Sequence, residues 1–290
     1  MPGDRPAVLV PVANPETAER LLDTAIDLAR DRDLSILVLT VVEVPMQLPL
    51  ERAREAMDVE SEEAVVTDAR DLAAEAGVPA TGRLRFGRDV AGGVVSVAER
   101  EEVEAILVGW RGRPRRREVV LGSYIDEILS EAPCDVLVKR IDRASDAVDS
   151  ILVPVAGGPH TEYAAEVAGS IAREHGARVE LVTVVGDEDE ERMAEARELL
   201  TQTSAALGAV ESVEETVLVG DVVSEIVERG RERGHDVTVL GATRGGFLRR
   251  VLVGDVPEAI ARESEGAVIM ARRGRRVVAL WKRLRNRLPV

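Results

Sequence analysis

The stretch VLVPVANPETAERLLDTAIDLAR, residues 8–30, returns later in the chain as ILVPVAGGPHTEYAAEVAGSIAR, residues 151–173, at an offset of 143. Each copy begins with a short apolar run typical of a buried strand and continues with apolar residues at helical spacing. A second match pairs AILVGW, residues 105–110, with VTVLGA, residues 237–242. The sequence therefore predicts an internal duplication that sets the organisation of the whole chain.

Within each repeat, short runs rich in Val, Ile and Leu alternate with amphipathic helical segments. The strands predicted for the first repeat are Val8–Val12, Ile36–Val42, Arg83–Phe86, Ala105–Val108 and Asp135–Val138. Runs that are apolar on both faces favour a parallel sheet covered by helices on each side. This pattern predicts an α/β fold with two tandem, doubly wound, Rossmann-like domains, each with a five-stranded parallel sheet.

The repeats place the domain boundaries. We predict a first domain over residues 1–142 and a second over residues 150–273, joined by the polar linker RASDAVDS. Residues 274–290 are basic, and their apolar residues share one helical face that includes Trp281. A basic amphipathic helix of this kind favours an anionic membrane surface or a partner groove, and the alternative is that it packs on the acidic body of its own chain.

Composition limits the classes of function. The net charge is −15, and only six of the 290 residues are aromatic, so general nucleic-acid binding is not expected. A single cysteine, Cys134, suits a reducing compartment. The chain starts without a cationic leader, and no apolar run approaches the ~18 residues of a membrane span. We expect a cytoplasmic protein, with its tail as the part that could touch the inner membrane face.

Glycines follow the fourth strand of the first repeat. Gly109 and Gly112 come directly after it, and Gly122 and Ser123 open the next predicted helix. Glycine lets main chain approach a ligand closely, and a helix N-terminus attracts phosphate. An ordinary loop glycine followed by a serine cap would look the same, so a single Gly-Ser pair leaves both readings open.

The full spacing, Gly, two residues, Gly, nine residues, Gly-Ser, resembles the nucleotide-binding signature of the universal stress protein family. VLVPVA at residues 8–13 and EAPCDVLV at residues 131–138 strengthen the resemblance, which covers both repeats. It implies the strand order 3-2-1-4-5 in each domain. It also implies pairing through the last strands, which would make the tandem chain an intrachain pseudo-dimer, alone or as part of a further homodimer.

The resemblance implies an ATP site in the first repeat, with or without Mg. The glycines and Ser123 would hold ribose and phosphates, Val41 would line the adenine slot, and two arginines of a loop that carries five would contact distal phosphates. The full set of expected contacts is Pro11, Val12, Ala13, Val41, Gly109, Arg111, Gly112, Arg113, Gly122, Ser123 and Tyr124. Ala13 stands where many ATP-binding members have aspartate, which removes a polar contact near the base.

The second repeat departs from the signature. Arg244 stands at the position of Gly112, and Asp255 at that of Ser123. A side chain at the first position intrudes on the phosphate, and a carboxylate at the second repels it. We therefore expect ATP in the first repeat only.

No catalytic or metal-binding pattern stands out. The sequence has no phosphate-loop lysine motif and no nucleophile elbow, so we expect at most slow ATP hydrolysis or autophosphorylation. His175 and His235 are expected at the surface, in no metal-ligand spacing.

Three functions remain open. The first is an ATP-binding stress or signalling protein. The second is a regulatory module that docks on a membrane transporter, because VPVANPETAERLL, EVPMQLPL and AGGPH resemble the cytosolic stress-protein domains of amino-acid permeases. The third is a scaffold dimer without a ligand.

Overall fold

A computed structural model describes residues 5–111, 123–142, 147–242 and 256–274. The first repeat contains β1 (Ala7–Pro11), α1 (Pro15–Arg32), β2 (Ser35–Glu43), α2 (Leu50–Ala56), α3 (Glu60–Glu75), β3 (Ala80–Gly87), α4 (Val90–Arg100), β4 (Val103–Trp110), α5 (Ser123–Glu131) and β5 (Asp135–Arg140). The second contains β6 (Ser150–Pro154), α6 (Pro159–His175), β7 (Arg178–Val185), α7 (Glu190–Ser204), the 3-10 turn η1 (Ala205–Leu207), β8 (Val213–Val219), α8 (Val222–Glu232), β9 (Val237–Gly241), α9 (Val256–Glu263) and β10 (Ala267–Arg272).

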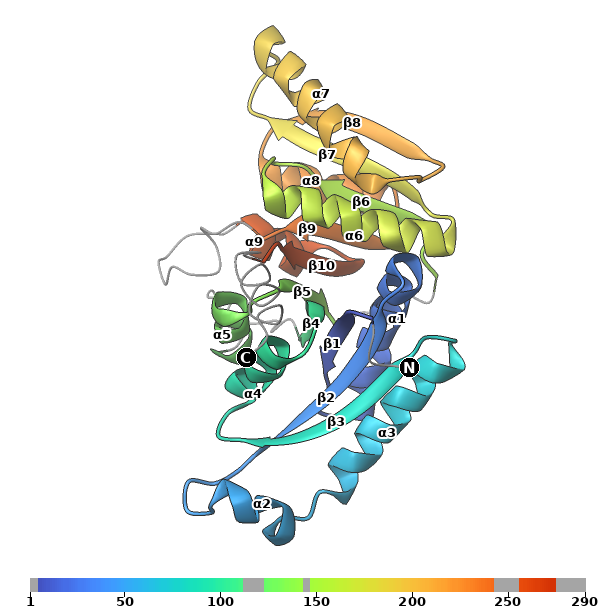
Figure 1. Cartoon of the computed structure of the whole chain (residues 1–290). Coiled ribbons are helices and arrows are strands. Elements are labelled where there is room, and N and C mark those ends of the chain that lie inside the picture. Colours follow the sequence, from blue (N-terminus) through green and yellow to red (C-terminus); the bar gives the residue numbers. More distant parts are fainter. Residues whose placement is uncertain (1–4, 112–122, 143–146, 243–255, 275–290) are drawn as a thin grey trace, which may run out of the picture.

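The sheet confirms the predicted strand order and joins the two repeats. The order of the described strands is β3-β2-β1-β4-β5-β10-β9-β6-β7-β8, so each repeat has the order 3-2-1-4-5. All pairs are parallel except β5 with β10, which is antiparallel. Figure 1 shows one twisted sheet running through both repeats, with α2 at one end and α7 at the other. The two expected five-stranded sheets are thus halves of a single ten-stranded sheet.

The junction of the two halves is symmetric in register. Val138 of β5 lies opposite Met270 of β10, and these residues hold equivalent positions in the two repeats, as Gly109 and Gly241 do. On either side, Leu137 pairs with Ala271 and Lys139 with Ile269. The pairing is therefore two-fold symmetric about Val138 and Met270. The residue before Val138 pairs with the residue after Met270, and the residue after Val138 pairs with the residue before Met270.

Each face of the sheet carries a core that spans both repeats. Side chains alternate between the faces along a strand. Helices α1, α3, α6 and α7 cover one face, with residues such as Leu28 and Ile171, and α4, α5, α8 and α9 cover the other, with residues such as Ile128 and Ile260. The sheet is buried between them, which explains strands that are apolar on both sides.

One buried arginine ties the first repeat to the second. Arg140, 3% exposed at the end of β5, donates hydrogen bonds to the carbonyl oxygens of Ala261, Ser264 (2.9 Å) and Gly266. These carbonyls lie in the last turn of α9 and just beyond it, where a helix leaves carbonyl groups without an internal partner. A cation at this end also complements the helix dipole. Arg140 thus caps a helix of the other repeat.

A second buried polar cluster corrects one expectation from the sequence. His235 is 7% exposed rather than at the surface. Its Nδ1 lies 2.5 Å from Ser150 Oγ and its Nε2 lies 2.9 Å from Glu180 Oε2. Glu180 also accepts from Arg229 Nε (2.8 Å) and Thr216 Oγ1 (2.7 Å). Together these bonds connect β6, β7, β8, α8 and the start of β9, so His235 is part of the interior.

Within the residues that the structure describes, no helix is both long and apolar enough to cross a membrane. The same residues contain no group of three or more His, Cys, Asp or Glu side chains placed to hold a metal ion.

Candidate functional site

Parallel pairing brings several predicted site residues to one edge of the sheet. Pro11 ends β1, Val41 lies near the end of β2, and Gly109 lies near the end of β4. The three strands are neighbours and run in the same direction, so their carboxyl ends share this edge. The starts of α1 and α5 follow directly from the loops there. In open α/β sheets, ligands bind at such an edge, where the strand order reverses.

The loop after β1 is held by hydrogen bonds on both sides. The Val12 amide donates to the Leu39 carbonyl (2.9 Å), and the buried Thr40 hydroxyl donates to the Val12 carbonyl (2.9 Å). Asn14 then caps α1, because its Oδ1 accepts from the Thr17 amide (2.9 Å). Ala13, between these anchors, is exposed. These hydrogen bonds hold the loop in place and leave Ala13 exposed. Thr40 and Asn14, which supply two of the bonds, were not among the site residues predicted from the sequence.

Val41 is half-buried and packs toward α4. A Cβ added at Gly93 would lie 2.8 Å from Val41 Cγ1, and one added at Gly87 would lie 3.3 Å from it. The two glycines therefore leave the space that the valine methyl groups fill. Asp89 caps α4 beside them, since its Oδ1 accepts from the Gly92 amide (2.6 Å). Because Gly93 has no side chain, α4 can pack closely against Val41 of β2 at this edge.

Gly109 has a structural reason of its own to lack a side chain. A Cβ there would lie 3.0 Å from Ile141 Cδ1 and 3.6 Å from Thr17 Cγ2. The carbonyl oxygen of Gly109 accepts a hydrogen bond from the Tyr124 hydroxyl (2.9 Å). Desolvation raises the pKa of the Tyr124 phenol further above its ordinary value, and the hydroxyl is a neutral donor at pH 7. Tyr124 thus ties the start of α5 to the end of β4.

Arg111 is exposed and paired. Its Nη2 lies 2.9 Å from Oε2 of Glu16 in the first turn of α1, and both side chains are more than half exposed. An exposed pair of this kind contributes little to stability and is easily exchanged. The guanidinium therefore stands at the edge with an acidic partner that an incoming anion could replace.

Gly112, Arg113 and Gly122 lie outside the described residues, and of Ser123 only its position at the start of α5 is described. The edge therefore brings together Pro11, Val12, Ala13, Val41, Gly109, Arg111 and Tyr124 from the predicted set.

Comparison with known proteins identifies the family. The model of the universal stress protein family matches residues 5–140 and again residues 147–272. The chain belongs to the universal stress protein family. The two matches correspond to the two repeats and meet at the linker, so the duplication is a tandem pair of stress-protein domains.

The curated proteins that resemble this universal stress protein include an antiporter. The chain is 25% identical over 270 residues to the Na(+)/H(+) antiporter NhaS5 of Synechocystis sp., a match over 91% of this chain but only 38% of the antiporter. It has the fold of a universal stress protein from Archaeoglobus fulgidus (TM-score 0.68, 20% identity, 92% and 96% of the chains covered). It also has the fold of the cytoplasmic domain of a prokaryotic cation chloride cotransporter (TM-score 0.62, 14% identity, 95% and 99% covered).

The stress-protein domain of the second repeat has a different edge. A Cβ on Gly241, the counterpart of Gly109, would lie only 2.7 Å from the backbone of His160 and Thr161 at the start of α6. His160 Nδ1 also accepts from the Arg273 amide (3.0 Å). In the second repeat the backbone of α6 therefore begins directly against the end of β9. In the first repeat α1 approaches Gly109 only with the methyl group of Thr17. The two edges are not equivalent. Arg244 and Asp255 lie outside the described residues.

An arginine that sequence reasoning did not single out organises the border of the first edge. Arg88 donates from Nη1 to the carbonyl oxygens of Val44 (3.1 Å) and Pro45 (2.6 Å), and from Nη2 to that of Leu48 (3.0 Å). It fixes the loop that leads from β2 to α2. In the sequence, the indication of this role is that Arg88 directly follows Gly87, the glycine that ends β3.

Proposed function

We propose that this universal stress protein binds ATP, with or without Mg, at the carboxyl edge of its first repeat and serves as a ligand-dependent regulatory module. The observation that carries the proposal is the convergence of the β1 loop, Val41, Gly109 and Arg111 beside the starts of two helices. Helix starts favour phosphate, and Arg111 offers a cation there. The antiparallel pairing of β5 with β10 supports the companion proposal that the repeats act as an intrachain pseudo-dimer.

The first repeat is proposed as the ATP-binding one because the edges differ. In the second repeat the first turn of α6 lies against Gly241, and the sequence replaces Ser123 by an aspartate. A carboxylate at a helix start occupies the amides that would bind phosphate.

Calorimetric titration of the full chain with ATP tests this proposal. We expect one site per chain, and we expect Ser123→Asp, which copies the second repeat, to weaken ATP binding about tenfold or more. Ser61→Asp is the matched control, because it adds the same charge to the exposed first turn of α3, and it should leave the affinity unchanged. Two equal sites, or binding that Ser123→Asp does not alter, would contradict the assignment to the first repeat.

A second proposal concerns the partner of the module. The 25% identity to an antiporter over 91% of this chain supports docking on a separate membrane transporter, with the basic segment 274–290 as the membrane contact. The tail adds cations that an anionic surface attracts. A scaffold without a ligand would need neither ATP nor a membrane.

Co-sedimentation with vesicles tests the membrane contact. We expect the full chain to sediment with vesicles that contain anionic lipid, and a chain ending at residue 273 to stay in the supernatant. Binding should fall as salt rises, because the attraction is between charges. Vesicles of neutral lipid are the control. Equal sedimentation of both chains would contradict a role for the tail.

A further inference from the structure

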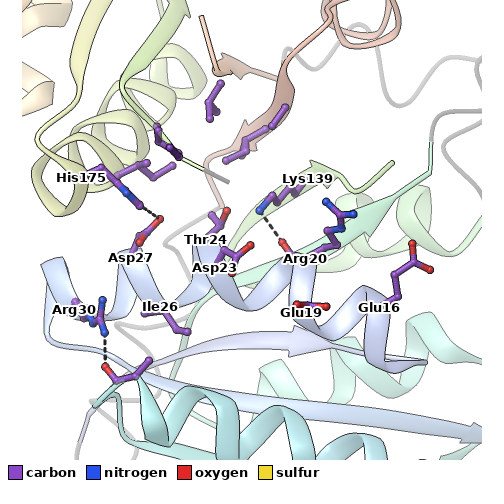
Figure 2. A pocket seen from close by; sticks show the side chains of 17 residues that line it. Glu16, Glu19, Arg20, Asp23, Thr24, Ile26, Asp27, Arg30, Lys139 and His175 are labelled. Carbon is purple, nitrogen blue, oxygen red and sulfur yellow. Dashed lines mark hydrogen bonds and ion pairs between the residues drawn. The ribbon is translucent and has the colours of Figure 1, made fainter. Parts of the chain in front are cut away.

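A cleft of about 590 Å³ opens between the two repeats along α1, and Glu16 at the start of α1 borders both this cleft and the edge described above. One wall is the acidic side of α1, and the opposite side is formed by the end of α6 with His175 (Figure 2). The sheet forms the base at the junction of β5, β10 and β9, with Lys139, Ile269 and Val237. Both repeats therefore build this cleft, and it has the size of a site for a small molecule.

Lys139 brings unused hydrogen-bond donors into the cleft. It is 8% exposed, and its Nζ donates one hydrogen bond, to the Arg20 carbonyl oxygen (2.6 Å). An ammonium has three protons to donate, and Lys139 makes no other hydrogen bond among the described residues. Burial lowers its pKa, although the charges of Asp23 and Asp27 work in the opposite direction. Such a group gains from an anionic partner that reaches it.

Two carboxylates of α1 border the same cleft. Asp23 and Asp27 are one helical turn apart and therefore lie on the same side of the helix. Asp27 is 8% exposed, and its Oδ2 lies 3.1 Å from Nε2 of His175. Burial raises the pKa of Asp27, while His175 opposes the rise. Asp23 makes no hydrogen bond or ion pair within the described residues, so the two carboxylates leave room for a cationic group.

Apolar side chains complete the lining. Ile269, Val237, Ala267, Ile171 and Val148 border the cleft beside the charged residues. A ligand that fits would therefore carry one anionic group, one cationic group and an apolar body. An anion alone would meet the two aspartates, and a cation alone would leave the Lys139 ammonium unsatisfied.

The equivalent space on the other side of the junction is filled. Tyr163, the counterpart of Arg20, is fully buried there, with the guanidinium of Arg273 4.5 Å and that of Arg32 5.8 Å from its ring centre. The counterpart of Lys139 is Ala271, which carries no charge. The first space is open, while its counterpart, which also holds charged side chains, is closed by an aromatic ring. The difference lies in side chains, since the two share one fold.

We propose that the cleft between the repeats binds a small apolar zwitterion, either a free amino acid or a short peptide. The carboxylate of the ligand binds the Lys139 ammonium, its ammonium lies between Asp23 and Asp27, and its apolar side chain packs on Ile269 and Val237. The site adjoins the ATP site of the proposed function at Glu16 but takes a different ligand, and it does not depend on ATP binding. Because both repeats line the cleft, occupancy stabilises their junction.

Titration calorimetry with matched probes tests the proposal on the full chain. L-phenylalanine carries both charges, phenethylamine lacks the carboxylate, and 3-phenylpropionate lacks the ammonium. We expect L-phenylalanine to bind at least about tenfold more tightly than either single-charge probe, since each lost charge pair is worth about that factor. Leucyl-phenylalanine separates the two ligand sources: tighter binding than phenylalanine assigns the cleft to short peptides, and weaker binding assigns it to free amino acids.

Three variants check that binding occurs in this cleft. Lys139→Met removes the cation, Asp23→Asn with Asp27→Asn removes the carboxylates, and Arg20→Tyr installs the ring that closes the equivalent space. We expect each to weaken L-phenylalanine binding about tenfold or more, with unchanged circular dichroism. Arg5→Met and Asp71→Asn change exposed residues outside the cleft and should have no effect.

Two results would overturn the proposal. One is no binding of L-phenylalanine or the dipeptide up to about 10 mM. The other is binding that phenethylamine matches and Lys139→Met does not weaken, which would reduce the cleft to an acidic surface.

Discussion

Arg140→Met lowers the free energy of unfolding of the full chain by an expected amount of about 3 kcal/mol. The substitution keeps an apolar stem of similar length but removes the donors to the carbonyl oxygens of Ala261, Ser264 and Gly266. Ala261 and Ser264 are buried and Gly266 is half-buried, so water replaces the guanidinium only in part and the freed oxygens retain a desolvation cost. The loss also removes the favourable charge at the end of α9.

Urea unfolding followed by circular dichroism measures this loss. Arg262→Met is the matched control, because Arg262 lies in α9 itself but is exposed and pairs only with neighbouring Glu263 among described residues. It should change the free energy of unfolding by less than about 0.5 kcal/mol. If the two variants were equally stable, the capping of α9 from β5 would not contribute to holding the repeats together.

Glu180→Gln is expected to destabilise the second repeat by about 3 kcal/mol at neutral pH and to have no such effect in strong acid. The Glu180 carboxylate is 2% exposed and accepts from His235, Arg229 and Thr216. Burial alone would raise its pKa, but these hydrogen bonds together lower it from an ordinary 4.5 to about 2. Gln at this position leaves the Arg229 cation without its buried partner.

The lowered pKa fixes the pH range of the effect. A carboxyl group whose pKa is lower in the folded state contributes its full stability above the unfolded value. The contribution therefore falls as pH drops from about 4.5 to about 2 and is lost below that. Urea unfolding of wild type and Glu180→Gln at several pH values should converge over this range. Exposed Glu215→Gln on β8 is the control, and a difference that stayed constant with pH would refute the role of the Glu180 charge.

Much of the fold follows from local pattern. The duplication, the apolar strands and the helical stripes predict two doubly wound domains, because burial on both faces of a parallel sheet leaves a clear signature in sequence. The structure shifts the first predicted strand by one residue, to Ala7–Pro11, and extends the other four of the first repeat, as at β4 (Val103–Trp110). The strand order came from the family resemblance, and the structure confirms it.

The surroundings of several polar side chains could not be predicted, because they depend on contacts between residues far apart in the sequence. His235 follows a polar helix and reads as a surface residue, yet Glu180, 55 positions away, buries it in a hydrogen-bonded network. Lys139 and Arg140 end a strand whose sequence marks neither of them as special. Only the pairing of β5 with β10 places Lys139 in the cleft and Arg140 at the end of α9. For the candidate site, the positions of Pro11 and Gly109 were predictable, but the partner of Arg111 was not.

The antiparallel pairing of β5 with β10 also fixes a stoichiometry. Each of these strands uses its outer edge to bond the other, so a separate stress-protein subunit finds no free strand at that position. The two unlike domains cannot be exchanged or diluted apart, as the subunits of a dimer can. Because both domains lie in one polypeptide, they are made in equal numbers whatever the expression level.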